Sequence, residues 1–217
     1  MTADVGRTAF VFAVLVVLGW FAIGTHVNVR RGHALLRWLE GGLSVLGPRT
    51  TLRWLGSSAI ELKVQGVLPP LRTAEVVIAL EPRDLPLLWW FFHARGRRDL
   101  LIVRGELVTT PLGELEALDR EAWTARGVER TVRERRWAPL ALPPDIPLVA
   151  YVNGRSDAAI PGLRLALFPG LGLVRLGVRQ RAPQVELQWT LASPERPDAR
   201  RVFEAVHELA GRVSARS

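Results

Sequence analysis

The chain lacks cysteine altogether, and among its 217 residues it has one lysine, Lys63, and two asparagines, Asn28 and Asn153. Without cysteine the protein forms no disulfide, thiolate nucleophile or cysteine-ligated metal site, although this leaves its compartment open. With a single lysine, arginine carries almost all of the positive charge behind the net +8. Such a skew is typical of GC-rich codon usage, and the alternative is a surface that binds polyanions.

Familiar catalytic and metal-binding motifs are also missing from the sequence. No two of the four histidines lie three or four residues apart, as a helical metal pair requires. No serine stands in a Gly-x-Ser-x-Gly setting. The carboxylates are scattered, and Asp99 is expected to pair with Arg97 and Arg98, which directly precede it. We therefore expect no catalytic residue, no cofactor and no metal.

The composition nevertheless predicts a folded domain. Hydrophobic residues make up 48% of the chain and charged residues 23%, a balance typical of globular proteins. The length allows one membrane anchor with one medium-sized domain or two small ones. A soluble part of roughly 190 residues buries a substantial core without disulfides or metals.

The longest uncharged apolar stretch runs over residues 8–29. At 1.5 Å per residue, an α-helix of about 22 residues crosses a hydrocarbon layer of ~30 Å. In lipid, a helix is the single-pass structure that pairs its own backbone groups. Trp20 and Phe21 lie toward its far end, near where interfacial aromatic residues gather. The sequence therefore predicts one transmembrane helix at residues 8–29.

A cleaved signal peptide is the main alternative for this stretch. The segment before it carries Arg7 against Asp4, the apolar run is long for a signal, and no small-x-small site precedes a polar start. We therefore expect an uncleaved anchor. Arg30, Arg31 and Arg37 follow the stretch, so the positive-inside rule places the large domain on the cytoplasmic side.

The juxtamembrane segment, residues 30–48, has the pattern of an amphipathic helix. Its leucines recur at helical spacing, and Gly47-Pro48 ends the pattern. We expect this helix to lie either on the bilayer surface or against the domain. The leucines of the stripe are Leu35, Leu36, Leu39, Leu43 and Leu46.

Beyond residue 49 the pattern predicts an α+β domain with a mixed or antiparallel sheet and flanking helices. The first half is expected to contain a hairpin at 50–64, a strand at 74–80, a helix at 85–94, a strand at 97–107 and a helix over 114–137. Four prolines predict a connector at 139–147. The second half is expected to contain strands at 147–152, 163–168, 171–180 and 184–191, then an amphipathic helix from Asp198.

The two halves resemble each other at an offset of about 111 residues. This offset places Leu52 on Leu163 and Glu75 on Glu186 without a gap. Two βββα-like repeats are one interpretation, and two unrelated pieces of one α+β domain are the other. The expected organisation is a tail and transmembrane helix at 1–29, the juxtamembrane helix at 30–48, a first α+β half at 49–138, a proline-rich connector at 139–147 and a second α+β half at 148–217.

The predicted helix at 85–94 is apolar on every side, unlike the amphipathic helix from Asp198. A helix wetted on one face does not carry adjacent aromatic pairs in all directions, so this helix has to bury two faces. We expect burial between the two halves. The alternative is the bilayer surface, where trailing arginines meet lipid phosphates. The candidate membrane or partner contacts are Trp89, Trp90, Phe91, Phe92, Arg95, Arg97 and Arg98.

Together these features predict a single-pass membrane protein with a non-catalytic interaction or scaffold domain. The first alternative is a peripheral module that binds anionic lipid or another polyanion through residues 85–92 and the following arginines. The second is a membrane-tethered enzyme of an unrecognised type. The expected partners are the lipid bilayer, through residues 8–29, and a protein of unknown identity. Nucleic acid is not expected, because no aromatic stacking pattern accompanies the arginine-rich run at 126–136.

Overall fold

The computed structural model describes residues 2–155, 159–193 and 195–214. Their fold is α+β, as predicted, and its centre is one nine-stranded antiparallel sheet. In spatial order the strands are β1 (Arg49–Trp54), β2 (Ala59–Gln65), β3 (Leu71–Ala79), β4 (Leu100–Leu107), β9 (Val185–Thr190), β8 (Gly172–Val178), β5 (Glu114–Leu118), β7 (Val149–Asn153) and β6 (Ala138–Leu140).

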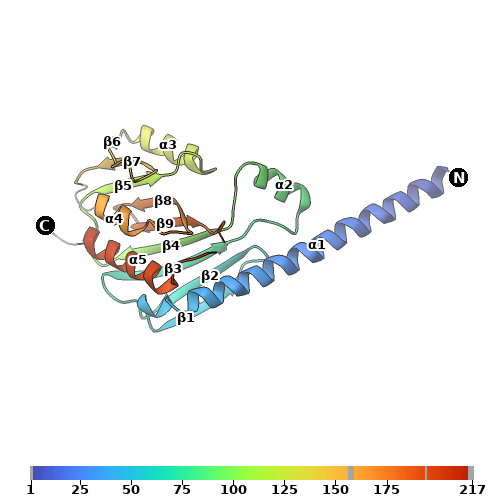
Figure 1. Ribbon diagram of the computed structural model, residues 1–217, viewed down its shortest axis with the longest axis horizontal. Helices are drawn as coiled ribbons and strands as arrows, with labels where there is room; N and C mark the ends of the chain where they lie inside the picture. Colours follow the sequence, from blue (N-terminus) through green and yellow to red (C-terminus); the bar gives the residue numbers. More distant parts are fainter. Residues whose placement is uncertain (1, 156–158, 194, 215–217) are drawn as a thin grey trace.

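Helices lie at one end of the sheet and on both of its faces. They are α1 (Thr2–Glu40), the short 3-10 helix η1 (Leu43–Val45), α2 (Pro86–Ala94), α3 (Ala125–Glu134), α4 (Ala159–Leu165) and α5 (Ala199–Ser214). The N-terminal half of α1 projects far beyond the domain, and α2 lies beside α1 near the point where it leaves the domain (Figure 1).

The main core fills the face of the sheet that α5, α4, η1 and the C-terminal half of α1 cover. Period-two burial puts Val76 of β3 and Leu101 of β4 on this face, where they meet Phe203 of α5. A smaller cluster lies on the opposite face, where Val128 and Val132 of α3 pack against Leu118 of β5. The sheet joins both predicted halves, and the main core draws residues from each.

The predicted juxtamembrane helix is continuous with the apolar helix before it. Helix α1 runs without a break through residue 30 and ends at Glu40, because Gly41 and Gly42 follow. Of the predicted leucine stripe, Leu35 and Leu39 are fully buried in the main core. Of the two expected locations, the structure therefore has this segment against the domain.

Two predicted elements are wrong in type. The helix expected over 114–137 begins only at Ala125, and Glu114–Leu118 form β5 instead. The first half of the strand expected at 163–168 falls in α4, which ends at Leu165. The second error also bears on the repeat: Leu163 lies in a helix, whereas Leu52, its aligned counterpart, lies in β1. The antiparallel pairs β2–β3 and β8–β9 still occupy corresponding positions in the two halves. The duplication therefore stays a prediction.

Candidate membrane-facing site

Helix α2 is exposed along its outer side, so the expected burial between the two halves is wrong. None of its residues is buried. Leu87 is 83% exposed and Trp90 68% exposed, and Leu88 and Phe91 are also exposed. Pro86 starts the helix without costing a hydrogen bond, because the first backbone N–H groups of a helix have no internal partner. The apolar outer side of α2, made of these four residues, faces away from the sheet.

The inner side of α2 rests on its neighbours through Trp89 and Phe92. The Trp89 indole N–H donates to the Glu81 carboxylate at 2.8 Å, and its ring lies 6.4 Å from that of Trp20 in α1. Phe92 packs near Trp123, with ring centroids 6.5 Å apart. The four adjacent aromatic residues thus divide into an inner pair and an outer pair, Trp90 and Phe91.

The three candidate arginines lie at the end of α2 and stay close to it. The Arg95 guanidinium lies 3.8 Å from the centre of the Phe91 ring. Arg97 lies over both Phe92 and Trp123, at 4.9 and 5.2 Å. Arg98 donates to the backbone carbonyls of His93 and Arg97. The structure therefore brings all the predicted contact residues together as one aromatic and cationic end of the domain.

Helix α1 is fitted tightly to the loop before α2. The Trp20 indole N–H donates to the Arg83 carbonyl at 2.9 Å. A side chain at position 24 would overlap the same carbonyl, so Gly24 allows the two backbones to touch. Asn28 is fully buried and donates to the Glu81 carbonyl at 3.0 Å. The last part of the predicted membrane span, from Gly24 onward, therefore packs on the domain along one side.

A buried ion-pair cluster lies beneath this contact, and its centre is Asp99. This carboxylate is only 1% exposed; it pairs with Arg31 of α1 and accepts from Arg83 at 2.9 Å. It also accepts the backbone N–H of Glu81 at 2.8 Å. The expected pairing of Asp99 with Arg97 and Arg98 is therefore wrong. Those two arginines turn toward α2, whereas Asp99 points into the junction between α1 and the sheet.

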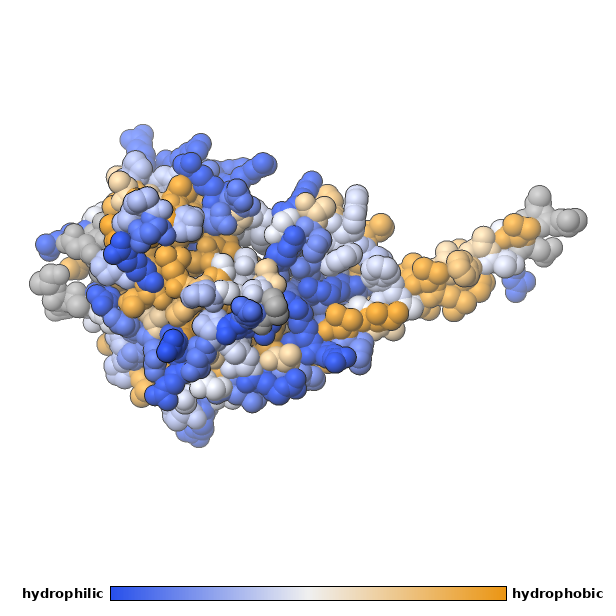
Figure 2. Space-filling view, in the orientation of Figure 1, coloured by the Kyte–Doolittle hydropathy of each residue, from blue (hydrophilic) through white to orange (hydrophobic). Residues whose placement is uncertain are grey.

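Polarity changes abruptly where α1 leaves the domain. The protruding part of α1 is an almost continuous hydrophobic rod, and hydrophilic side chains cover much of the domain surface beside it (Figure 2). This helix is the one described segment that is long and apolar enough to cross a membrane, and a signal sequence or a core helix also meets that criterion.

A second polar surface lies on the sheet face opposite the main core. Cross-strand neighbours of alternating charge run from Lys63 through Glu75 and Arg104 to Glu186. Beyond them, Arg175 donates to Glu116 through two bonds of 2.9 Å. Arg179 donates to the same carboxylate at 2.7 Å. Gly177 of β8 is the cross-strand neighbour of both Glu116 and Glu186, and a side chain there would crowd Arg179 and Glu116.

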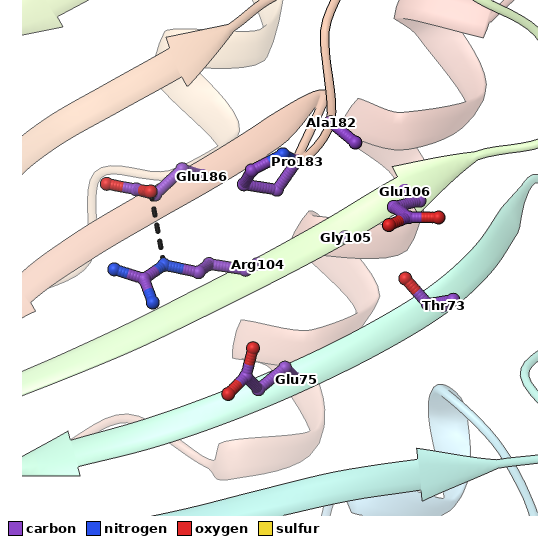
Figure 3. A pocket seen from close by; sticks show the side chains of 8 residues that line it. All are labelled: Thr73, Glu75, Arg104, Gly105, Glu106, Ala182, Pro183 and Glu186. Carbon is purple, nitrogen blue, oxygen red and sulfur yellow. Dashed lines mark hydrogen bonds and ion pairs between the residues drawn. The ribbon is translucent and has the colours of Figure 1, made fainter.

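A hollow of about 410 Å³ lies on this face (Figure 3). Burial would raise the pKa of Glu186, but the positive charges of Arg175, Arg179 and Arg104 outweigh it and lower the pKa. Burial, together with the nearby Glu61 carboxyl, raises the pKa of Glu75. The hollow is lined by Thr73, Glu75, Arg104, Gly105, Glu106, Ala182, Pro183 and Glu186.

The shifted pKa values of Glu75 and Glu186 both have structural explanations on this face. Arg104 lies between Glu75 and Glu186 in the cross-strand row and is hydrogen-bonded to Glu186 at 3.2 Å. Within the described ranges, no group of three or more histidine or acidic side chains is placed to hold a metal ion.

In comparisons with known proteins, no family model matches the chain and no curated protein matches it at a significant level.

Sequence reasoning found the aromatic and cationic end but missed the cluster that supports it. Asp99, Arg31 and Arg83 come from segments more than fifteen residues apart, which local patterns do not connect. The one feature of the sequence that could have indicated this contact is Asn28. A polar side chain inside an otherwise apolar helix requires a buried partner, and the Glu81 carbonyl is that partner.

Proposed function

We propose that this chain is a single-pass membrane protein whose domain is held on the bilayer surface by two contacts, α1 and α2. The observation that carries the proposal is the position of the apolar outer side of α2. It is exposed, and Trp89 on the inner side of the same helix lies beside Trp20, near the level where α1 leaves the domain. Indole rings favour the membrane–water boundary because they combine an apolar body with a polar N–H.

The continuity of α1 supports an uncleaved anchor. One helix carries both the exposed apolar stretch and the buried Leu35 and Leu39. Cleavage within residues 24–28 would remove the Trp20–Arg83 hydrogen bond and expose the loop on which Gly24 is packed. Retention of the helix keeps these contacts, so we propose that it serves as an anchor rather than as a signal peptide.

The flanking charges support a cytoplasmic domain. Arg30 and Arg37 are exposed on α1 just beyond the apolar stretch, whereas Arg31 is paired with Asp99. Two free flanking arginines still exceed the single Arg7 on the other side. The positive-inside rule then places the domain in the cytoplasm.

Insertion of α2 into the bilayer boundary is favoured by its composition. Moving one aromatic ring of 150–250 Å² out of water contributes about 4–6 kcal/mol when burial is complete. Trp90 and Phe91 supply two such rings in part, and Leu87 adds an aliphatic side chain. Arg95 and Arg97, at the end of the helix, lie where lipid phosphates would accept their hydrogen bonds. We therefore include binding of anionic lipid by α2 and these arginines in the proposal.

A non-catalytic interaction role for the rest of the domain is the second proposal. The charged row across the open sheet face supports it, because ordered and mutually paired charges form a rigid polar surface suited to a protein partner. Turnover of a broad substrate panel by the full-length protein would instead favour the enzyme alternative.

The bilayer contact of α2 is tested with single-cysteine variants, since the chain has no native cysteine to interfere. Leu87→Cys carries a spin label on α2, and Val108→Cys carries one just beyond the far end of β4. In proteoliposomes, the label at 87 should be accessible to oxygen and protected from a water-soluble nickel complex, and the label at 108 should show the reverse. Equal accessibility of both labels to nickel would exclude the contact.

A further inference from the structure

The two sides of α1 leave the domain at different positions along the helix axis. On the side that faces the domain, contact begins at Trp20 and is closest at Gly24. On the opposite side, Ile23 and Val27 are still exposed. The apolar surface available to lipid is therefore shorter on one side of the helix than on the other.

The shorter side is too short for a typical bilayer. From Thr8 to Gly19 there are about 12 residues, or ~18 Å of helix at 1.5 Å per residue. From Thr8 to Val27 there are about 20 residues, or ~30 Å, which matches an average hydrocarbon layer. A layer that covered the longer side would therefore also reach the loop at residues 81–84 on the shorter side.

That loop cannot enter hydrocarbon, whereas α2 can. The loop carries Glu81, Arg83 and Asp84, and beneath it lies the Asp99 cluster. Charged groups at this depth are costly unless water or lipid headgroups reach them. Helix α2 beside it presents Leu87, Trp90 and Phe91. The edge of the hydrocarbon therefore has room to cover the outer side of α2 but has to stop at the loop.

We infer that the protein fits a thin bilayer, with a hydrocarbon layer of roughly 20–25 Å rather than ~30 Å. This inference rests on the proposed membrane contact of α2 and adds to it the kind of membrane that the two contacts suit. In a thicker layer, either the charged loop is drawn into lipid or the bilayer has to thin around the protein, and tilting α1 shortens its span still further. The protein should therefore be sorted toward thin membranes.

The test uses the full-length chain in phosphatidylcholine vesicles whose acyl chains have roughly 14 to 22 carbons. We expect the thermal unfolding midpoint to be highest in the thinner bilayers and to fall as the chains lengthen. The matched variant has four leucines inserted between Val16 and Val17. This insertion lengthens the free span by ~6 Å and leaves every contact with the domain unchanged, so the optimum should shift by ~6 Å toward thicker layers.

The spin label at position 87 separates this inference from the proposal beneath it. If that label lies in hydrocarbon in every bilayer while the midpoint is independent of thickness in both proteins, the preference for thin bilayers is wrong and the α2 contact stands. A label that lies in water at every thickness overturns both. An optimum that the insertion fails to move also contradicts the inference.

Discussion

Asp99 forms the ion pair that connects the long N-terminal helix α1 to the sheet domain. Its carboxylate pairs with Arg31 of α1 and with Arg83 of the loop before α2. It also accepts a hydrogen bond from the backbone N–H of Glu81. Because it is almost fully buried, its negative charge is stable only while these partners surround it. Asp99 therefore provides the charged part of the contact between α1 and the domain, beside the Trp20 and Asn28 hydrogen bonds.

Replacing Asp99 with Asn keeps the shape of the side chain and removes its charge. Arg31 then loses its counter-charge and Arg83 keeps only its longer ion pair with Glu81, so the free energy of unfolding should fall by about 3–5 kcal/mol. Asp145→Asn is the matched control, because the Asp145–Arg164 pair is exposed and should contribute less than about 1 kcal/mol. Urea unfolding in detergent micelles measures both, and equal effects would contradict the role of Asp99.

Glu75 and Glu186 on the open sheet face have pKa values shifted in opposite directions, so we expect opposite effects of pH on their contributions to stability. The pKa of Glu75 is raised, so its contribution to stability is present below its unfolded pKa and is lost as pH rises through the higher folded value. Glu75→Gln should therefore stabilise the protein at pH ~7 and lose this gain near pH ~4.

The pKa of Glu186 is lowered, so its contribution is present above its unfolded pKa and is lost as pH falls through the folded value. Glu186→Gln should therefore destabilise the protein at pH ~7, by about 1–3 kcal/mol, and by less in acid. Unfolding midpoints of both variants across this pH range check the prediction. The same sign of effect for both variants would contradict the opposite directions of the two pKa shifts.

At the scale of elements, the loop before α2 fixes where α1 leaves the domain. Gly24 is the position at which the helix backbone touches the Arg83 carbonyl. Position 19, one and a half turns earlier, has open space around it. Gly19 and Gly24 of the same helix therefore provide an internal comparison.

Gly24→Ala should force α1 away from the loop and break the Trp20–Arg83 hydrogen bond, at a cost of about 1–3 kcal/mol. Gly19→Ala should leave stability unchanged or raise it slightly, since alanine favours helix over glycine. Urea unfolding in micelles measures the change in the free energy of unfolding for both variants. A neutral Gly24→Ala variant would mean that α1 is not held by this contact.

The elements could largely be predicted from the sequence where their pattern was long or strongly marked. Alternation predicted β2, strand-like stretches predicted β8 and β9, and the proline-marked apolar run predicted α2. The failures have local causes. Leu115 and Leu118 mimic helical spacing although they lie in β5, a strand of five residues. In α4, alternating Leu163 and Leu165 mimic a strand although the segment is helical.

The candidate site was only half accessible to this reasoning. The residues of α2 were found because an apolar helix without a polar face is unusual in itself. Whether that helix is buried or exposed depends on where α1 and the sheet place it, and those contacts join segments that are distant in the sequence. The predicted burial between halves failed because one continuous sheet already joins the two halves.

On the scale of the whole molecule, the proposal describes a domain held at a fixed angle to its membrane. Helix α1 enters the core as one rigid rod, and the Asp99 cluster and Gly24 hold its base. With α2 as a second contact, the domain would have little freedom to rotate about the anchor. The charged open face of the sheet would then be presented to partners in one orientation.

The most direct test of this account is a photo-crosslinking amino acid at position 87 in the full-length protein, activated in the membranes of cells. The account predicts an adduct whose added mass is that of a phospholipid, and none from position 108 beyond the far end of β4. An adduct to another protein at position 87, or labelling by neither lipid nor protein, would contradict the claim that α2 lies in the bilayer beside the anchor.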